Sequence, residues 1–346
     1  MRIALVAPVD ESVPPTAYGG IEQVVHLLDE DLAARGHDVL LLASGESSSA
    51  GRLITLTSGP LAARGPDDGK LDLVPSKDEA MRRAGSILRH ERPDAVLNHS
   101  WRLLDHLGDL NSPVLTTIHY ALDAEPYRSN FLARADATFV SVSRSQQTAL
   151  PVLRYAGNVY NGIDVATLPF RDQPDDYLAY LGRVSPDKGL DTAIRVAQRA
   201  GMPLKVAAKL DPEWRPWFEE VIAPLVRGGG VELLGEISSA DKGPFLAGAV
   251  GLLHPSRWSE PFGLAAVEAM ACGTPVLALR RGAAEEVVVD GKTGFVLDRE
   301  AGFDAAIERL GSLDRSACRQ HAEARFGRAR MAEGYERLVQ EAAASP

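Results

Sequence analysis

Two glutamates with seven residues between them lie near and within an otherwise apolar segment. Glu260 precedes the segment Gly263–Cys272, and Glu268 is its one charged residue. Small and apolar residues on every side predict a helix that is buried all round, ended by Gly273 and Pro275. A lone carboxylate there costs several kcal/mol unless it is paired or hydrogen-bonded. Either both carboxylates face a polar ligand in a cleft, or a nearby arginine or backbone amide neutralises Glu268.

Two cations lie close together after an apolar run in the second half of the chain. Arg183 ends the predicted strand Leu178–Arg183, and Lys188 follows on a turn. Arginine offers a planar fork of N–H groups and lysine a point charge, so the two could clamp a diphosphate. Two solvated surface charges would have the same spacing, and the sequence leaves both interpretations open.

Two glycines after the first predicted strand could approach an anion. In Tyr18-Gly19-Gly20, the glycines open the first predicted helix, Ile21–Arg35, where backbone N–H groups have no partner within the helix. An ordinary connection from strand to helix would carry the same glycines, and the six-residue dinucleotide fingerprint is absent from the sequence.

Two histidines, His99 and His119, each end a predicted strand of the first half. Because ligands bind at the carboxyl ends of parallel strands, both are predicted to face a cleft. His119 could meet an acceptor hydroxyl or a sugar, whereas His99 could be satisfied by hydrogen bonds alone. Trp101 could stack on a sugar or pack against its neighbours.

Two other runs are predicted to be surface features. Asp29–Asp31 looks like an acidic metal site, but we place it on the exposed face of the first helix. Gly291–Thr293 resembles the end of a phosphate-binding loop, but Glu286 stands where the first glycine of that motif is required.

Short apolar runs alternate with amphipathic helices along nearly the whole chain, which predicts an α/β protein with parallel sheets covered on both faces. We expect two doubly wound, Rossmann-like domains facing a central cleft, residues 1–165 and 166–326, and a helix in 327–346 that returns to the first domain. The Gly-, Ser- and Pro-rich stretch Ser44–Asp72 is predicted to be a mobile loop. The predicted strands are Arg2–Pro8, His37–Ala43, Ala95–His99, Val114–His119, Thr138–Ser143, Asn158–Tyr160, Leu178–Arg183, Leu204–Ala208, Val231–Leu234, Val250–His254 and Val276–Leu279, and the clearest helices are Ile21–Arg35, Asp78–Glu91 and Met331–Ala344.

Length and composition exclude several classes of protein. The 346 residues exceed one ordinary core, and 45% hydrophobic with 24% charged residues is typical of a globular protein. A net charge of −10 argues against nucleic acid as a partner. The two cysteines cannot form a disulfide framework and lack metal-ligand spacing. With no signal peptide and no apolar run of about 20 residues, we expect a soluble, cytoplasmic protein without a membrane segment.

Taken together, these motifs resemble the family 4 retaining glycosyltransferases of the GT-B fold, including compact antibiotic-tailoring members. The resemblance spans almost the whole chain, and the glutamate pair has the family's spacing. The departures are the missing glycine near Ala207–Lys209, Tyr160 in place of a common proline, and the turn Gly282–Glu286. The motifs that carry the resemblance are Gly19–Glu22, Asn161–Asp164, Gly182-Arg183 with Lys188-Gly189, Glu260–Gly263, Glu268–Val276 and Asp290–Gly294.

The resemblance implies a role for each matching residue. Arg183 and Lys188 would hold the donor diphosphate, Glu268 would hydrogen-bond the ribose, and Glu260 would contact the donor sugar. The remaining implied contacts are Gly19 and Gly20 on the phosphates, backbone amides of Phe262, Gly263 and Leu264 on the sugar or the distal phosphate, and His99, Trp101 and His119 on the acceptor side, with His119 also near the donor sugar.

The resemblance therefore implies a retaining glycosyltransferase that moves a sugar from a nucleoside-diphosphate sugar, most readily a UDP-sugar, to a small hydroxylated acceptor or glycan. It implies no cofactor and no metal, because fixed cations and helix dipoles would stabilise the departing diphosphate. Two alternatives stay open at this point. One is a nucleotide-sugar epimerase or phosphorylase on the same fold, and the other is a sugar-nucleotide-binding partner without catalysis.

Overall fold

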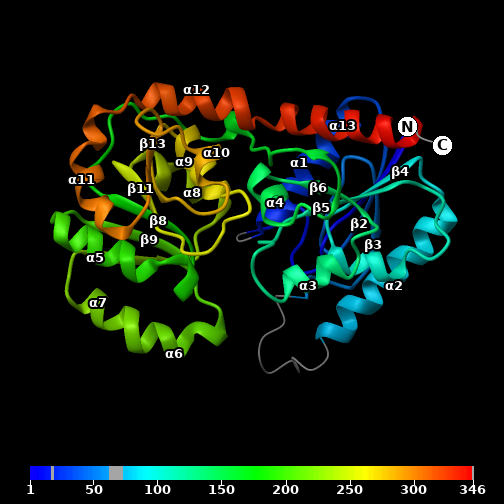
Figure 1. Ribbon diagram of the computed structural model, residues 1–346, viewed down its shortest axis with the longest axis horizontal. Helices are drawn as coiled ribbons and strands as arrows, with labels where there is room; N and C mark the ends of the chain where they lie inside the picture. Colours follow the sequence, from blue (N-terminus) through cyan, green and yellow to red (C-terminus); the bar gives the residue numbers. More distant parts are fainter. Residues whose placement is uncertain (17–18, 62–72, 345–346) are drawn as a thin grey trace. The chain divides into compact units, whose positions relative to one another are not determined.

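The computed structural model describes residues 1–16, 19–61 and 73–344. The chain divides into two compact units: unit 1 is Met1–Gly162 with Arg328–Pro346, and unit 2 is Ile163–Gly327. Each unit has its own parallel sheet with helices on its faces (Figure 1), which confirms the predicted α/β class. Within the described ranges, no helix has the length and apolar character needed to cross a membrane.

The sheet of unit 1 has seven parallel strands, and buried apolar residues make up its centre. Four residues of β1, Ile3 to Val6, are fully buried, because helices cover both faces of the strand. Val6 pairs with Leu42 on one side and with Asn98 on the other. In sheet order the strands are β3 (Arg52–Thr55), β2 (Asp38–Ala43), β1 (Arg2–Val6), β4 (Ala95–Asn98), β5 (Val114–Ile118), β6 (Thr138–Ser141) and β7 (Arg154–Asn158).

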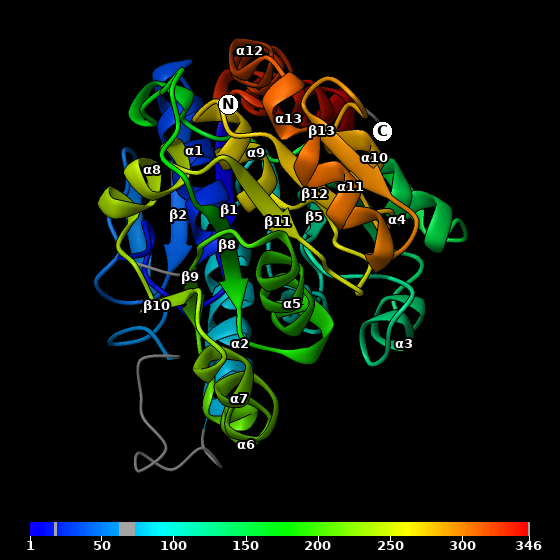
Figure 2. The ribbon, with the colours of Figure 1, turned by 90° about the vertical axis from the view of Figure 1, so that its left-hand side faces the viewer.

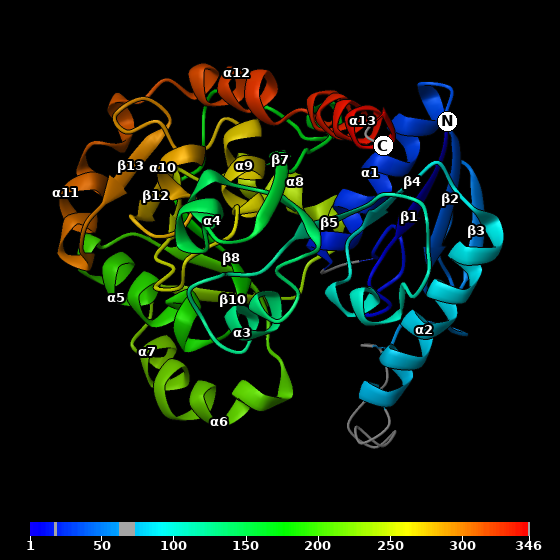
Figure 3. The same cartoon turned by 45° about the vertical axis from the view of Figure 1, so that its right-hand side comes forward.

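The helices of unit 1 bury one apolar face each. In the first helix, α1, the predicted apolar residues Val24, Val25, Leu28 and Leu32 are all buried, which confirms that face. Figure 3 shows α1, α2 and α13 around the strands of this unit. Its helices are α1 (Gly20–Ala34), α2 (Leu73–Glu91), η3 (Trp101–His106), α3 (Tyr127–Leu132), α4 (Arg144–Ala149) and α13 (Arg328–Ala344).

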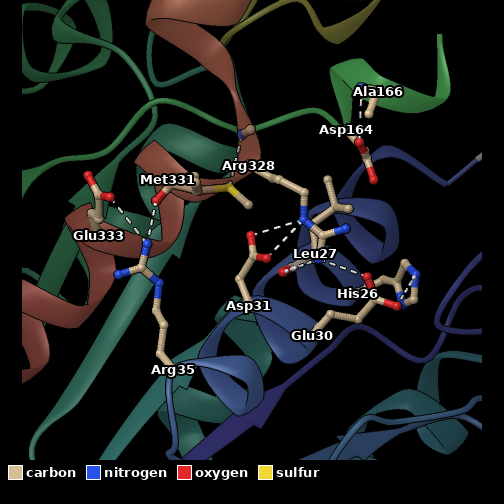
Figure 4. A network of polar contacts seen from close by, with 12 residues as sticks. His26, Leu27, Glu30, Asp31, Arg35, Asp164, Ala166, Arg328, Met331 and Glu333 are labelled. Atoms are coloured by element: carbon tan, nitrogen blue, oxygen red, sulfur yellow. Dashed lines mark hydrogen bonds and ion pairs between the residues drawn. The ribbon is translucent and has the colours of Figure 1, made fainter.

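The last helix, α13, is fixed to α1 by ion pairs as well as by apolar packing. Arg328 donates from Nε to both carboxylate oxygens of Asp31, each at 3.0 Å, and from Nη2 to Glu30 at 2.7 Å (Figure 4). Arg35, the residue that ends α1, pairs with Glu333 at 3.3 Å. These contacts anchor the C-terminal end of α1 to the C-terminal helix.

The sheet of unit 2 has six parallel strands (Figure 2). Its core joins the faces of β8, β9 and β12 to the apolar face of α5, with Leu178, Ile194 and Leu277 fully buried. In sheet order the strands are β10 (Val231–Gly235), β9 (Leu204–Lys209), β8 (Leu178–Arg183), β11 (Gly251–His254), β12 (Val276–Leu279) and β13 (Gly294–Leu297).

Helices and single helical turns connect the strands of unit 2. The longest are α5 and α12, and the predicted buried helix is α9. The helical elements are η4 (Val165–Thr167), η5 (Pro186–Lys188), α5 (Leu190–Ala200), η6 (Pro212–Trp214), α6 (Arg215–Trp217), the π-helical turn η7 (Phe218–Ile222), α7 (Ala223–Arg227), α8 (Ser239–Ala247), α9 (Leu264–Ala271), α10 (Ala284–Val287), η8 (Glu300–Gly302), α11 (Phe303–Glu308), η9 (Leu310–Ser312) and α12 (Arg315–Phe326).

The structure corrects three of the expected elements. Residues 52–55 form the edge strand β3 inside the stretch that we predicted to be a mobile loop, and residues 62–72 of that stretch lie outside the described residues. Strand β7 ends at Asn158, where we expected a strand to begin. The four residues of β13 follow a turn and escape the sequence analysis altogether.

In each sheet, successive strands are first added on one side of the first strand and then on its other side, which creates one switch point. In unit 1, β1 lies between β2 and β4, and in unit 2, β8 lies between β9 and β11. In open α/β sheets, ligands bind outside the carboxyl ends of the strands at such switch points. This rule directs attention to the residues that follow β1 and β4 in unit 1 and those that follow β8 and β11 in unit 2.

Candidate functional site

The two predicted cations of unit 2 follow β8, at the switch point of its sheet. Tyr180, buried on β8, donates from its hydroxyl to the carbonyls of Arg183 at 3.0 Å and of Lys188 at 3.4 Å. It therefore holds the two ends of the turn together. The Arg183 guanidinium lies 4.0 Å from the carboxylate of Asp211.

Lys188 and Glu260 form a close ion pair. The lysine Nζ donates to Glu260 Oε2 at 2.5 Å, and both side chains are largely buried. Burial alone would raise the pKa of Glu260, but the charges of Lys188, His254 and Arg183, with the lysine hydrogen bond, hold it below its ordinary value. Glu260 is therefore ionised at neutral pH. His254, which ends β11, lies 4.0 Å from the same carboxylate oxygen, and burial lowers its own pKa.

Close backbone approaches fix the segments on either side of this pair. A Cβ atom on Gly189, whose φ is +72°, would lie 2.3 Å from the carbonyl oxygen of Pro255. A Cβ on Gly282 would lie 2.2 Å from the carbonyl oxygen of Glu260, which accepts a hydrogen bond from Ala283 N at 2.9 Å. The turn after β8 and the loop after β11 are thus packed backbone to backbone.

Arg257 joins the same two segments through its side chain. It binds the carboxylate of Asp191, on the first turn of α5, with two N–H groups at 3.0 Å each. It also donates to the carbonyl of Pro186 at 2.9 Å and to the hydroxyl of Thr192 at 2.6 Å. A bidentate arginine–carboxylate pair fixes orientation as well as distance. Arg257 therefore holds the loop that carries Glu260 against the turn that carries Lys188.

Glu268 is neutralised, although by a partner that the sequence does not reveal. Glu268 lies on α9 and is 9% exposed, and Lys242 of α8 donates to its Oε1 at 2.5 Å. The expected arginine or backbone amide is thus replaced by a lysine. The pairing accounts for a charge in a helix whose other residues, apart from the first two, are fully buried or nearly so.

The segment between the two glutamates presents backbone rather than side chains. Phe262 is 3% exposed and packs edge-on against Phe326, with ring centroids 5.5 Å apart. Gly263 is the N-cap of α9 and has φ +94°, a conformation that favours glycine. A helix N-terminus offers N–H donors and a partial positive charge to an anion. The predicted backbone contacts at Phe262, Gly263 and Leu264 fit this geometry.

In unit 1, the two predicted histidines contact one another. His99 Nδ1 lies 2.9 Å from His119 Nε2, so one ring donates and the other accepts. Burial lowers the pKa of His119 to about 3 and, with the neighbouring ring, lowers that of His99 well below its usual value. Both are neutral at pH 7. The ring of Tyr335, on α13, has its centroid 6.0 Å from that of His99, and its hydroxyl shares a hydrogen bond of 2.9 Å with Thr117.

The other predicted residues of unit 1 have mixed surroundings. Gly19 caps α1, and a Cβ there would lie 2.5 Å from Pro15 Cβ, so glycine permits a close chain approach. Gly20 begins α1, and Tyr18 lies outside the described residues. Trp101 packs against the core around Phe131, with two arginine guanidinium groups over its ring. These contacts favour packing as its role.

The two segments that we predicted to be surface features, Asp29–Asp31 and Gly291–Thr293, are only partly exposed. Asp29 is fully buried, contrary to our placement, because Ser49 Oγ and Ala50 N donate to its carboxylate at 2.7 and 2.6 Å. Thr293 is also fully buried, so Gly291–Thr293 is not wholly a surface turn. Cys272 and Cys318 are both buried and free, as expected.

Sequence reasoning missed five side chains that surround the cations and carboxylates of unit 2. Tyr180, Asp191, Lys242 and Arg257 carry no local signal, because each acts on a residue from another element. His254 could have been found, since it ends a predicted strand just as His99 and His119 do. In the portions of the chain that the structure describes, no group of three or more metal-binding side chains is arranged to hold an ion.

Two family models match the chain, one for each half. The model described as glycosyl transferases group 1 matches residues 169–325, and the model described as Glycosyltransferase Family 4 matches residues 18–167. Together they cover nearly all of the residues that surround the two switch points.

Curated relatives and solved structures agree with these matches. Glycogen synthase of Mycobacterium tuberculosis is 28% identical, over 97% of this chain and 91% of that protein. The phosphatidyl-myo-inositol mannosyltransferase of Mycobacterium leprae is 27% identical, over 89% and 85%. The structure of AviGT4, a glycosyltransferase involved in avilamycin A biosynthesis, has a TM-score of 0.77 at 24% identity, covering 100% and 99% of the two chains. Anabaena HepE in complex with UDP and glucose has a TM-score of 0.75 at 20% identity, over 99% and 100%.

Proposed function

The chain belongs to the family 4, group 1 glycosyltransferases of the GT-B fold, and from that premise we propose a retaining enzyme with a nucleoside-diphosphate sugar, most readily a UDP-sugar, as donor. It transfers the sugar to a hydroxyl of a small molecule or glycan. It uses no metal and no cofactor, and it acts in the cytoplasm.

The observation that carries this proposal is the cluster of charged residues at the carboxyl edge of the unit 2 sheet. Lys188 and Glu260 are in contact there, and Arg183 ends the strand beside them. Lysine has three N–H donors, so Lys188 can contact a phosphate oxygen while it retains Glu260. Two cations fixed before the reaction stabilise the diphosphate as its bond to the sugar breaks. A metal ion is then not required for that charge.

The carboxylates serve the rest of the donor. Glu268 accepts a hydrogen bond from the ribose, and Glu260, ionised beside Lys188, accepts hydrogen bonds from the donor sugar near the reacting carbon. The backbone N–H groups of Phe262, Gly263 and Leu264 contact the sugar or the distal phosphate. The complexes of HepE with UDP and with UDP-glucose support a uridine donor in this fold.

Unit 1 supplies the acceptor side in this proposal. His119, held by His99, is a neutral group that can hydrogen-bond a hydroxyl at any pH above about 4, since its pKa is about 3. Gly19 and Gly20 approach the phosphates, whereas Trp101 stays packed within unit 1. Loops of unit 1 bind the acceptor in this proposal, and the fold does not determine which acceptor they select.

Calorimetric titration with UDP, GDP, ADP and dTDP, with and without a chelator, tests the donor site. We expect one nucleotide to bind tightly and equally with and without chelator. Lys188→Ala and Glu260→Gln should then lower turnover of the matching nucleotide sugar about a hundredfold, the usual effect of removing a preorganised electrostatic group.

Lys292→Ala is the matched control for Lys188→Ala, because Lys292 is exposed on a turn of the same unit. It should turn over at the wild-type rate. Wild-type rates in both site variants would show that this assignment of Lys188 and Glu260 is wrong. Release of an epimerised sugar without acceptor would instead indicate an epimerase.

A further inference from the structure

Lys242 is a partly buried lysine that belongs to none of the motifs described above. Its Nζ lies 2.5 Å from Glu268 Oε1, and the Lys242 and Glu268 side chains are 25% and 11% exposed. Among the residues that the structure describes, it is the one hydrogen-bond partner of the Glu268 side chain. A carboxylate can accept at both oxygens, so Lys242 leaves Oε2 available to another donor.

The helix that carries Lys242 is fixed to the helix that carries Glu268. Ser238 caps α8 by accepting from Asp241 N at 3.2 Å. Beyond Lys242, Thr274 donates to the carbonyl of Leu246 at 2.7 Å, which ties α8 to the end of α9. A Cβ on Gly243 would lie 2.6 Å from Pro169 Cδ, so this turn of α8 also packs closely on the chain before β8. The lysine is thus presented by a rigid element.

We propose that Lys242 is a positioning residue for donor binding, which holds Glu268 so that its second carboxylate oxygen meets the ribose hydroxyls of the nucleotide. Lys242 makes no contact with the nucleotide itself in this account. The proposal rests on the proposed function, because it assigns Glu268 to the ribose. It extends that function to a residue that determines selectivity for ribonucleotides.

Two physical consequences of the ion pair support this role. The lysine places a positive charge 2.5 Å from a largely buried carboxylate, and hydrogen bonds in such a charged pair are strong. It also restrains the carboxylate rotation, so that one oxygen is reserved for the lysine and one for the ligand. A hydroxyl that is hydrogen-bonded to an oriented carboxylate contributes more to affinity than one bonded to a freely rotating group.

The experiment measures selectivity for the ribose hydroxyls rather than affinity alone. UDP, GDP and ADP, each beside its 2′,3′-dideoxy counterpart, are titrated calorimetrically into wild type, Lys242→Met, Glu268→Gln and the double variant. Lys205→Met is the matched control, since Lys205 pairs with Glu232 elsewhere in unit 2. Thermal melting of each variant reports whether it is folded.

We expect Lys242→Met to weaken binding of the preferred ribonucleotide about tenfold, because the ribose would lose most of its hydrogen bond to a misplaced Glu268 carboxylate. Binding of the dideoxy counterpart should change less than twofold, and Lys205→Met should change neither. In the Glu268→Gln background, removal of Lys242 should have no further effect on either nucleotide. That comparison holds even if Lys242→Met alone, with its unpaired buried carboxylate, does not fold.

Three outcomes would overturn the inference. Equal weakening of both nucleotides would mean that Lys242 acts on the phosphates or on the fold, and no weakening of either would mean that it has no role. A further loss of affinity in the Glu268→Gln background would show that the lysine acts independently of Glu268. Failure of the wild-type protein to bind any of the three ribonucleotides would instead contradict the proposed function itself.

Discussion

Burial affects three glutamates of this chain in different ways, according to their neighbours. Glu260 and Glu268 are each matched by a lysine at 2.5 Å. Glu22, on the first turn of α1, is 4% exposed, and the acidic residues Asp10 and Glu11 act on its carboxyl group. Burial, with the charges of Asp10 and Glu11, raises the pKa of Glu22 to about 7. The first two glutamates are therefore each matched by a positive charge, whereas Glu22 gains and loses a proton near neutral pH.

This difference predicts a pH-dependent effect of Glu22→Gln on the stability of unit 1. The folded protein keeps the Glu22 proton up to about pH 7, but the unfolded chain releases it above about 4.5, so unfolding is favoured as the pH rises between these values. The full cost above pH 7 is about 3 kcal/mol. Glu22→Gln should raise the melting temperature at pH 8 and leave it nearly unchanged at pH 5.

Thermal melting of both proteins at the two pH values checks this, with hydrogen exchange of α1 to show that unit 1 is the part affected. Glu79→Gln is the control, because the Glu79 side chain is 73% exposed and should change neither value. Equal shifts at pH 5 and pH 8 would show that the titration of Glu22 is not the cause.

At this scale, the sequence predicts which residues need partners better than it predicts the partners. A charge in an all-apolar helix indicates that Glu268 needs a polar partner, and the structure places Lys242 against it. Lys242 lies on another helix, and only the packing of α8 on α9 brings it to the carboxylate. Asp29 shows the same limit: its neighbours in sequence place it on a helix surface, but the chain around Ser49 folds over it.

Among the elements of unit 2, the turn after β8 and the loop after β11 act as one piece, because Arg257 binds Asp191 across them. Misplacement of a catalytic group by about 1 Å can cost a hundredfold in rate. We therefore predict that Arg257→Met lowers kcat about tenfold to a hundredfold while the chain stays folded. Arg257→Lys should recover only part of this loss, since lysine cannot bind Asp191 bidentately.

Arg195→Met provides the matched control for steady-state kinetics of these variants. Arg195 pairs with the same Asp191 at 2.8 Å, but both residues belong to α5, so this ion pair does not connect α5 to the loop. It should retain most of the activity. Equal losses in the Arg195 and Arg257 variants would mean that the charge balance at Asp191 matters and that the connection between the two segments does not.

How well the sequence locates a strand depends on how deeply that strand is buried. The central strands β1, β8 and β12 each contain a run of buried, mostly apolar residues because helices cover both faces, and the sequence predicts their positions within a few residues. The edge strands β3 and β7 are partly exposed, so their residues lack that pattern. Strand β3 is also flanked by glycine and serine, which indicate a loop. Pairing with β2, a contact distant in sequence, decides its structure.

At the scale of the whole molecule, the chain passes from unit 1 to unit 2 at Gly162 and Ile163 and returns at Gly327 and Arg328. Unit 2 is thus one continuous stretch, closed at its ends by the hydrogen bond from Ile163 N to Phe326 O at 2.8 Å. Unit 1 is assembled from two stretches, and α13 contributes the fully buried Tyr335 to its core. The two units should therefore differ in their ability to fold alone.

We predict that the isolated stretch Ile163–Gly327 folds and binds the donor nucleotide with an affinity within tenfold of the full chain. It contains a complete six-stranded sheet, and Arg183, Lys188 and Glu268 all lie within it. Residues 1–162 alone should be poorly folded, because they lack the apolar face of α13 and the hydroxyl partner of Thr117. Circular dichroism, thermal melting and calorimetric titration of both fragments check this. Lys188→Ala, made in the full chain and in Ile163–Gly327, is the control for specific binding.

If Ile163–Gly327 folds but does not bind the nucleotide that the full chain binds, unit 1 must supply much of the affinity. The donor site would then not be a property of unit 2 alone, because the charged cluster after β8 and β11 would be insufficient without groups from the other unit.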